Sequence, residues 1–454
     1  MKRHVLVGVL SVSCAPAAPS PAAPPAATPA PVTTVSTPTV RDQDRLLQAK
    51  VAEALAYVAG IRQLPPKAEV RGRAISKAEV ARYLEQQLDE ELPKDVLEAS
   101  EALLYGLGTV DASFAYRQTM IELMQAQLLG FYDPKQKTFF VGDKLTGSEA
   151  DVTLWHELVH ALQDQHYDLS RITDWKPDAG DSIAAAHALA EGDATSAMID
   201  AMMKPRGMTA LDIEEGLMRA ESVLGVAASS APPILVRSLV APYADGLAFV
   251  NGLRRRSGFA AVDDAWRALP VSTEQILHLD KYLAAEPPLV VEAPKPPPHA
   301  VELQERFRDV LGEQTARLLL EEWLPARTAA EAASGWGGDR VAIFSDEPRQ
   351  RWAVAWHLRF DSVADADRAF AAWARVLPLT DREAAAGARI PPAKTAVKGD
   401  ELCRERHNRG PIALVRRGQD LGVTVGPFER NSVAVKTDPG CPSGTRWARL
   451  IVTP

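Results

Sequence analysis

The sequence is poor in cysteine, has no excess of basic charge, and lacks a membrane-length apolar run near its start. Three cysteines occur in 454 residues, and none has a partner at CxxC spacing, which excludes a cysteine zinc site. The 51 basic and 59 acidic side chains give a net charge of −8, and no basic cluster is longer than Arg254–Arg256. Nucleic acid is therefore excluded as a partner. With 46% hydrophobic and 24% charged residues, the composition is typical of a soluble globular protein rather than a disordered or polytopic membrane chain.

The N-terminus predicts export. Two basic residues precede an apolar run from Val5 to Val12, which is far short of the roughly 20 residues that span a bilayer. The run ends at Ser13-Cys14, which resembles the lipobox of bacterial lipoproteins, whose cysteine is acylated. Because Ser11 holds the position where lipoboxes usually carry Leu, a plain secretory signal is the alternative. We predict a signal segment over 1–14 with lipidation at Cys14, an Ala/Pro-rich tether over 15–39, and a protein anchored to a membrane of the cell envelope.

Two further cysteines remain if Cys14 carries a lipid. Cys403 and Cys441 form an even pair, which in an exported protein is permitted to make a disulfide. Two separate buried thiols are the alternative.

Periodicity divides the rest of the chain into two domains. Residues 40–286 are mostly helical in pattern, a Pro-rich linker covers 287–299, and residues 300–454 mix strand and helix patterns. The fold class we predict is α+β, a mainly helical domain with a small sheet followed by a smaller α+β domain. The expected elements are helices over 41–61, 76–92 and 96–107, a hairpin over 130–141, helices over 301–324 and 362–376, and strands over 340–344, 352–360, 412–416 and 421–425.

The chemistry is concentrated in the segment His156-Glu157-Leu158-Val159-His160. Two histidines four apart on a helix project about 40° from each other, so both rings can reach one ion while Glu157 lies at the rim. We expect Ser148 to cap this helix. The pattern predicts a zinc hydrolase, and the alternative is a pair of histidines hydrogen-bonded in a helical core.

A catalytic zinc normally takes three protein ligands and leaves a fourth position for water. His166 completes the spacing of the metzincin signature HExxHxxGxxH, but Gln163 stands where that family has the glycine that turns the chain. If the helix continues, His166 lies about 240° round from His160 and cannot bind the same ion. The third ligand is therefore expected elsewhere.

Four segments together carry a family resemblance. The chain resembles exported bacterial proteins with a zincin-like, gluzincin-type metallopeptidase domain, over approximately residues 41–282, through HELVHALQDQ at 156–165, GFYDP at 130–134, LAEGDAT at 189–195 and STEQILH at 272–278. The resemblance implies an active-site helix beside a sheet whose edge strand runs antiparallel to bound peptide. We place that edge at Lys137–Val141.

The resemblance also implies the remaining site residues. Gluzincins take their third ligand, a glutamate frequently followed by glycine, from the helix after the HExxH helix, and Glu191-Gly192 is similar. A solvated Glu191 is the alternative, and His187 can substitute for it or support it from one turn earlier. A downstream tyrosine supplies the oxyanion donor in several gluzincins, which implies Tyr243, with His278 as a competitor and a core role for the tyrosine as the alternative.

These residues predict an enzyme. Zn²⁺ held by His156, His160 and Glu191 would activate a water, and Glu157 would take its proton and pass it to the leaving amine. The predicted function is zinc-dependent hydrolysis of a protein or peptide substrate in the cell envelope. The alternative is a non-catalytic envelope lipoprotein that uses a metal-stabilised zincin scaffold to bind a partner. Glu157 favours the enzyme, because a scaffold needs ligands but no base.

Overall fold

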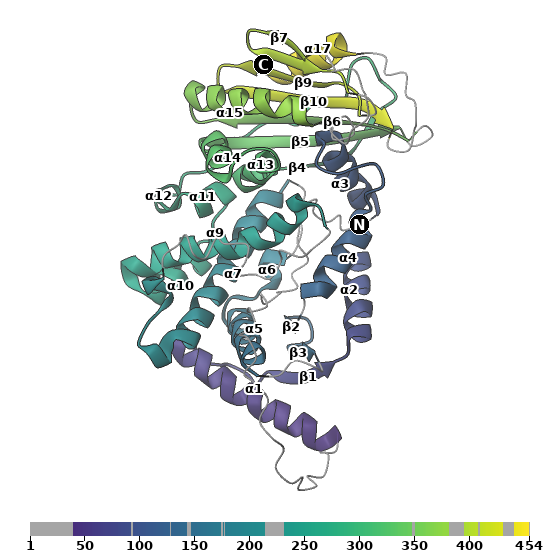
Figure 1. Ribbon diagram of the computed structural model, residues 1–454. Coiled ribbons are helices and arrows are strands. Elements are labelled where there is room, and N and C mark those ends of the chain that lie inside the picture. Colours follow the sequence, from purple (N-terminus) through teal and green to yellow (C-terminus); the bar gives the residue numbers. More distant parts are fainter. Residues whose placement is uncertain are drawn as a thin grey trace, which may run out of the picture.

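The computed structural model describes residues 40–453 apart from 92–93, 128, 143–146, 174–175, 177, 214–230, 347–349, 381–394, 407–408 and 430–439. The predicted signal segment, Cys14 and the tether lie outside the described residues. The described chain forms a mixed α+β structure, with a helical part that carries a small sheet and a second part built on a larger sheet (Figure 1).

The helical part is formed by residues 40–283. Its helices are α1 (Val40–Arg62), α2 (Lys77–Glu91), α3 (Lys94–Leu107), α4 (Tyr116–Gln127), α5 (Ser148–Tyr167), α6 (Ser170–Thr173), α7 (Gly180–Met203), α9 (Pro233–Ser257), α10 (Phe259–Arg267), α11 (Thr273–Leu277) and α12 (Leu279–Leu283). The helices expected over 41–61, 76–92 and 96–107 are confirmed as α1, α2 and α3.

A three-stranded sheet lies beside α5. Its strands are β1 (Arg71–Ile75), β2 (Gly130–Asp133) and β3 (Thr138–Gly142), in the order β1-β3-β2. The expected hairpin is confirmed, since β2 and β3 pair antiparallel. The expectation that Lys137–Val141 forms a sheet edge is wrong, because β1 pairs parallel with β3 and places it at the centre. The edge strand next to α5 is β2, whose four residues are all buried.

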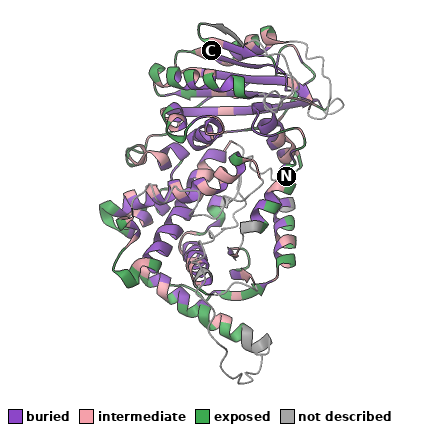
Figure 2. Cartoon of the chain, viewed as in Figure 1, coloured by how far each residue is buried: buried purple, intermediate pink, exposed green. Residues whose placement is uncertain are grey.

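Helices α7 and α9 form the centre of the helical part. Most of α7 consists of small residues, and it is buried along nearly all its length (Figure 2). Small side chains let two helix backbones approach closely. By length and composition α9 is apolar enough to cross a membrane, but 61% of its apolar window is buried inside the molecule. It packs mainly on α7, as a core helix does.

The second part is built on a seven-stranded antiparallel sheet. Its strand order is β4-β5-β6-β10-β9-β8-β7, with the bounds β4 (Gln304–Asp309), β5 (Trp336–Asp346), β6 (Arg351–Phe360), β7 (Thr395–Lys398), β8 (Glu401–Arg404), β9 (Ile412–Arg417) and β10 (Asp420–Glu429). The strands expected near 340–344, 352–360, 412–416 and 421–425 are confirmed within this sheet. The helices of this part are α13 (Gly312–Leu320), α14 (Ala326–Ala333), α15 (Val363–Val376) and α17 (Cys441–Ile451).

Alternate residues of the strands face two different cores. Val354 and Trp356 of β6 join the core that includes α13 and α15, whereas Ala353 and Ala355 pack with Trp447 of α17. This is the period-two alternation of a strand covered on both faces. The disulfide between Cys403 of β8 and Cys441 at the start of α17, with Cα atoms 5.6 Å apart, fastens α17 to its face.

One predicted element of this part is wrong. The helix expected over 301–324 is a strand, β4, followed by a shorter helix, α13. Gly312, which begins α13, has a φ of 79°, a conformation that a helix passing through this residue cannot contain. The broken backbone lets Gln304–Asp309 pair with β5 instead.

The two parts share one hydrophobic core. Helix α3 contacts β4, β5, β6 and β10, and its buried Leu103 and Leu107 belong to the same cluster as Trp356 and Val425 of the sheet. The Pro-rich segment 287–299 also lies against the sheet, where the Leu289 N–H donates to the Gly337 carbonyl at 2.6 Å. The sheet therefore depends on a helix that precedes it by about 200 residues in the sequence.

Candidate metal centre

Helix α5 carries the HExxH segment through the middle of the helical part. The helix begins at Ser148, with Gly147 in the position before it, and the side chain of Ser148, which we expected to cap the helix, lies outside the described residues. Leu154, Leu158 and Leu162 are buried, and so are the residues between them except Trp155, which is half-buried. Because this stretch of α5 is covered on nearly all sides, His156 and His160 lie inside the protein rather than on a solvated face.

Three nitrogen and oxygen ligand atoms converge at this place. His156 Nε2 lies 3.1 Å from His160 Nε2 and 3.1 Å from Glu191 Oε2, and His160 Nε2 lies 3.5 Å from the same oxygen. Ligand atoms about 2 Å from a tetrahedral zinc lie about 3.3 Å from one another. The spacing of these three atoms therefore fits a tetrahedral ion, and two imidazoles with one carboxylate are a donor set that zinc accepts.

Glycines of two helices bring Glu191 to this position. A Cβ on Gly192 of α7 would lie 2.1 Å from the carbonyl carbon of Gly246 in α9, and one on Gly246 would lie 1.9 Å from the Ala188 oxygen. The two backbones are thus in direct contact one residue beyond the carboxylate. His187 Nε2 donates a hydrogen bond to Glu191 Oε1 at 3.1 Å, so His187 supports the carboxylate rather than replacing it.

His156, His160 and Glu191 shift one another's pKa values. Burial opposes charge on His160, but the negative charge of Glu191 and its hydrogen bond outweigh this and raise the histidine pKa to about 9. Burial likewise opposes ionisation of Glu191, yet the charge of His160 and hydrogen bonds from three histidines hold its pKa well below the usual range. Burial lowers the pKa of His156. At neutral pH the centre therefore contains an anionic oxygen beside a protonated His160 and a neutral His156, and a metal cation can replace the proton on His160.

Glu157 lies beside these ligand atoms but turns to the sheet. Its Oε2 accepts a hydrogen bond of 2.9 Å from the Tyr132 N–H of β2. Its Oε1 is buried and, among the described residues, has no hydrogen-bond partner, and the same is true of His156 Nδ1. Burial raises the pKa of Glu157 well above its usual range. A buried polar atom with no partner is uncommon in a native protein and indicates a position where water or a ligand binds.

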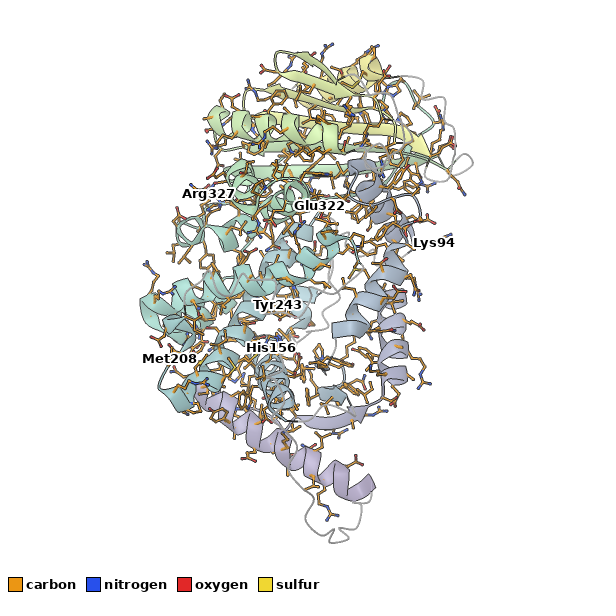
Figure 3. The ribbon with its side chains drawn as sticks, in the orientation of Figure 1. Lys94, His156, Met208, Tyr243, Glu322 and Arg327 are labelled. Carbon is orange, nitrogen blue, oxygen red and sulfur yellow. A yellow bond between two sulfur atoms is a disulfide. The ribbon has the colours of Figure 1, made fainter. Side chains whose placement is uncertain are left out.

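Tyr243 joins this group, and His278 does not. The Tyr243 ring, on α9, stacks on His156 with ring centroids 5.8 Å apart, and the two side chains lie side by side in Figure 3. His278 instead pairs with both oxygens of Glu313 on α13, at 2.9 and 3.0 Å. His166 also lies elsewhere. Helix α5 continues to Tyr167, and His166 Nε2 contacts the Pro65 carbonyl at 2.8 Å.

The residues behind His160 were not predicted from the sequence. Gln163, which entered only as the residue in place of a glycine, hydrogen-bonds to His160 Nδ1 and to Asp193. Asp193 in turn binds Arg62 from α1. Gln163 could have been found from the sequence, because it is a polar residue three positions after the second histidine of a helical motif. Arg62 gave no such local signal, since it lies 131 positions from Asp193.

A second cluster of metal-binding residue types is explained by an ion pair. Glu274, Glu286 and Asp361 offer oxygens within 4.8 Å of one another. The ammonium of Lys281 lies among them, at 2.6, 2.8 and 2.5 Å. The Lys281 ammonium already takes the place that an ion would occupy between these oxygens, so this cluster is not a candidate metal centre.

Comparison with known proteins covers only the second part of the chain. Residues 301–431 match a family described as a domain of unknown function (DUF8575). The match begins after the candidate metal centre and contains none of its residues. No curated protein and no solved structure matches the chain.

Proposed function

We propose that this protein is a zinc-dependent peptidase with a zincin-like, gluzincin-type catalytic domain. The observation that carries the proposal is the convergence of His156, His160 and Glu191 from two helices, with the carboxylate of Glu157 beside them and outside the ligand set. A structural zinc site needs four ligands and no base, whereas a catalytic site keeps three ligands and a nearby carboxylate.

The protein residues would divide the reaction as follows. When bound, zinc supplies Lewis acidity, which polarises a carbonyl and lowers the pKa of a coordinated water towards 7. Glu157 Oε1, the oxygen without a partner among the described residues, takes a proton from the attacking water. The new carbon–oxygen bond forms as the carbon–nitrogen bond weakens, and Glu157 returns the proton to the leaving amine. Burial raises the pKa of Glu157, which makes its carboxylate a stronger base than that of an exposed glutamate.

Tyr243 is the oxyanion donor in this proposal. Its ring stacks on the ring of His156, which supports a place for the phenol beside the proposed ligands. A phenol donates a hydrogen bond to an oxygen that gains negative charge during the reaction, and it remains protonated at neutral pH. The substrate is a protein or peptide, and the place of action is the cell envelope, with attachment to a membrane through Cys14.

Replacing Glu157 with Gln tests the mechanism. Gln keeps the side-chain length and an oxygen that accepts the Tyr132 N–H, but it cannot take a proton. We expect Glu157→Gln to bind one zinc ion per chain as the wild type does and to cleave a mixed peptide library about 100-fold more slowly or worse. Zinc is measured by elemental analysis and cleavage by mass spectrometry of the products. Equal cleavage by the two proteins would contradict the proposal.

A second candidate function is a non-catalytic scaffold stabilised by the metal. The observation that favours it is burial: His156 and Glu157 are both 0% exposed and Glu191 is 1% exposed. A closed centre suits a structural ion. The same measurements separate the two functions, since the scaffold predicts that both proteins bind zinc and that neither cleaves any peptide.

A further inference from the structure

A buried chain of hydrogen bonds leads from the candidate metal centre to α1. His160 Nδ1 lies 2.8 Å from Gln163 Oε1, and Gln163 Nε2 donates to Asp193 Oδ2 at 3.1 Å and to the Ala190 carbonyl at 3.0 Å. Asp193 also accepts from Trp266 Nε1 at 2.9 Å and from Arg62 Nε at 2.5 Å. Gln163, Asp193 and Arg62 are all 0% exposed.

Arg62 and Trp266 can only donate hydrogen bonds and the Ala190 carbonyl can only accept one. These three groups therefore fix which atom donates in every bond of the series. Arg62 cannot lose its proton and the indole N–H of Trp266 can only donate, so Asp193 must accept from both. The Ala190 carbonyl also can only accept. Gln163 therefore faces two acceptors on one side, and its amide nitrogen must be on that side. Its oxygen must then face His160.

The orientation of the Gln163 amide determines which nitrogen of His160 carries a hydrogen. An amide oxygen can only accept, so Nδ1 of His160 must carry a hydrogen. When the ring carries a single hydrogen, Nε2 keeps its lone pair, and Nε2 is the atom that lies 3.1 Å from His156 Nε2 and 3.5 Å from Glu191 Oε2. The ring is thus presented to the centre in the one form that binds a metal through Nε2.

We propose that Gln163 and Asp193 are positioning residues that hold His160 as a metal ligand by fixing which ring nitrogen carries the hydrogen. This inference rests on the proposed function, because it assigns the hydrogen-bond chain a purpose only if His160 binds zinc. Asp193 is held by Arg62, and Arg62 is in turn held by Asp263, whose Oδ1 accepts from Arg62 Nη2 at 2.7 Å. The orientation of a ligand on α5 is therefore fixed from α1 and α10.

Zinc affinity, measured by competition with a chromophoric chelator, tests the proposal. Gln163→Met keeps the volume of the side chain and removes its hydrogen bonds, and we expect zinc to bind about 10- to 100-fold more weakly. Gln165→Met is the matched control. Gln165 is on the same helix and also uses its amide, but it bonds to the backbone at Lys67 and Ala68, so its loss should leave zinc affinity unchanged.

Asp193→Asn provides a second variant of nearly the same shape. Its oxygen keeps the position that faces both Gln163 Nε2 and Trp266 Nε1, so its amide nitrogen faces the Arg62 guanidinium, which can only donate. We expect Asp193→Asn to bind zinc more weakly than wild type but more tightly than Gln163→Met, because Gln163 keeps its bonds while Asp193 loses its support from Arg62. Urea unfolding of each metal-free variant shows whether it has folded.

Nitrogen-15 NMR of the histidine rings gives a measurement that a merely structural role would not change. In zinc-loaded wild type, His160 should show a hydrogen on Nδ1 that exchanges slowly with water, and in Gln163→Met this hydrogen should exchange faster. A hydrogen on Nε2 of His160, or wild-type zinc affinity in a folded Gln163→Met, would overturn the inference. If wild type itself binds no zinc, and His160→Ala makes no difference, the proposed function fails first and the inference falls with it.

Discussion

The two oxygens of Glu157 have different surroundings. Oε2 accepts the Tyr132 N–H, whereas Oε1 is buried without a partner among the described residues. One bond fixes the direction of the side chain, and the other oxygen stays available for a proton. An aspartate would be shorter by one methylene, about 1.5 Å, so it would lose either the bond to β2 or its place beside the ligand atoms. A glutamate is therefore long enough to bond to β2 and to lie beside the converging ligand atoms, and an aspartate is not.

The assignment of the third ligand predicts a clear difference between two variants. Glu191→Ala removes the only carboxylate among the three converging atoms, so zinc affinity should fall at least 100-fold. His166→Ala should leave it unchanged, because that ring contacts the Pro65 carbonyl. Both are measured by chelator competition, with circular dichroism to confirm the fold. Loss of zinc in His166→Ala alone would contradict the assignment.

The residues that converge at the candidate metal centre were predicted from the sequence, and the residues around them were not. His156 and His160 are four positions apart, and residues at this spacing lie on the same side of any α-helix. Glu191 came from a resemblance, because no local pattern relates it to a histidine 31 positions away in the sequence. The links from Gln163 to Asp193 and Arg62 were missed, since hydrogen-bond partners far apart in the chain are fixed only by the packing of α1, α5 and α7.

The contact between α7 and α9 predicts what a single methyl group does. In Gly246→Ala the new Cβ would lie 1.9 Å from the Ala188 carbonyl oxygen and 3.1 Å from Gly192 N, and backbone atoms cannot turn away as a side chain can. We expect the free energy of unfolding to fall by about 2 kcal/mol or more. Because α7 must shift beside Glu191, zinc affinity should fall as well.

Gly60→Ala is the matched control for this substitution. Gly60 lies inside α1 and has nothing within 4 Å of the added Cβ. Alanine favours the helix by about 0.5–1 kcal/mol relative to glycine, so this variant should be as stable as wild type or more so. Urea denaturation measures both, and a Gly246→Ala protein of unchanged stability would show that the two helices are not in contact.

Elements with a strong local pattern were predicted well, and elements that depend on distant partners were not. Helices α1 and α15 and the hairpin β2–β3 follow from periodicity and turn chemistry within a few residues. Strand β1 has no alternation of buried and exposed residues, and it exists because β3 lies beside it. The same cause explains the error at the sheet edge: β3 ceases to be an edge strand once β1 joins it.

Across the whole molecule, the second part is fastened to the helix that carries Glu191. Asp309, at the end of β4, accepts a 2.9 Å hydrogen bond from the Gly180 N–H at the start of α7. Asp181, the next residue, accepts from both the N–H and the hydroxyl of Thr273, at 3.0 and 2.6 Å. These bonds connect the sheet part, α11 and the N-terminus of α7. The start of α7 is therefore held from both the sheet part and α11.

The same contacts predict how stability depends on pH. Burial raises the pKa of Asp181 to about 8 from an ordinary value of 3.8, and hydrogen bonds from Thr273 only partly oppose it. Because the pKa of Asp181 is higher in the folded chain than in the unfolded chain, protonation of its carboxyl stabilises the folded state. This stabilising contribution is complete below about pH 4. This contribution is lost as the pH rises towards about 8, by up to about 1.4 kcal/mol per pH unit.

Asp181→Asn removes this titration and keeps an oxygen for both bonds from Thr273. We expect its unfolding free energy to depend less on pH than that of wild type between about pH 4 and pH 8, with the variant relatively more stable at the upper end. Urea unfolding at several pH values, with excess chelator so that zinc does not contribute, measures the difference. Asp264→Asn is the control, since that side chain is 77% exposed and its replacement should leave the slope unchanged. Parallel curves for wild type and Asp181→Asn would mean that Asp181 has the same affinity for protons in the folded and unfolded chains, and that the junction at the start of α7 is open to water.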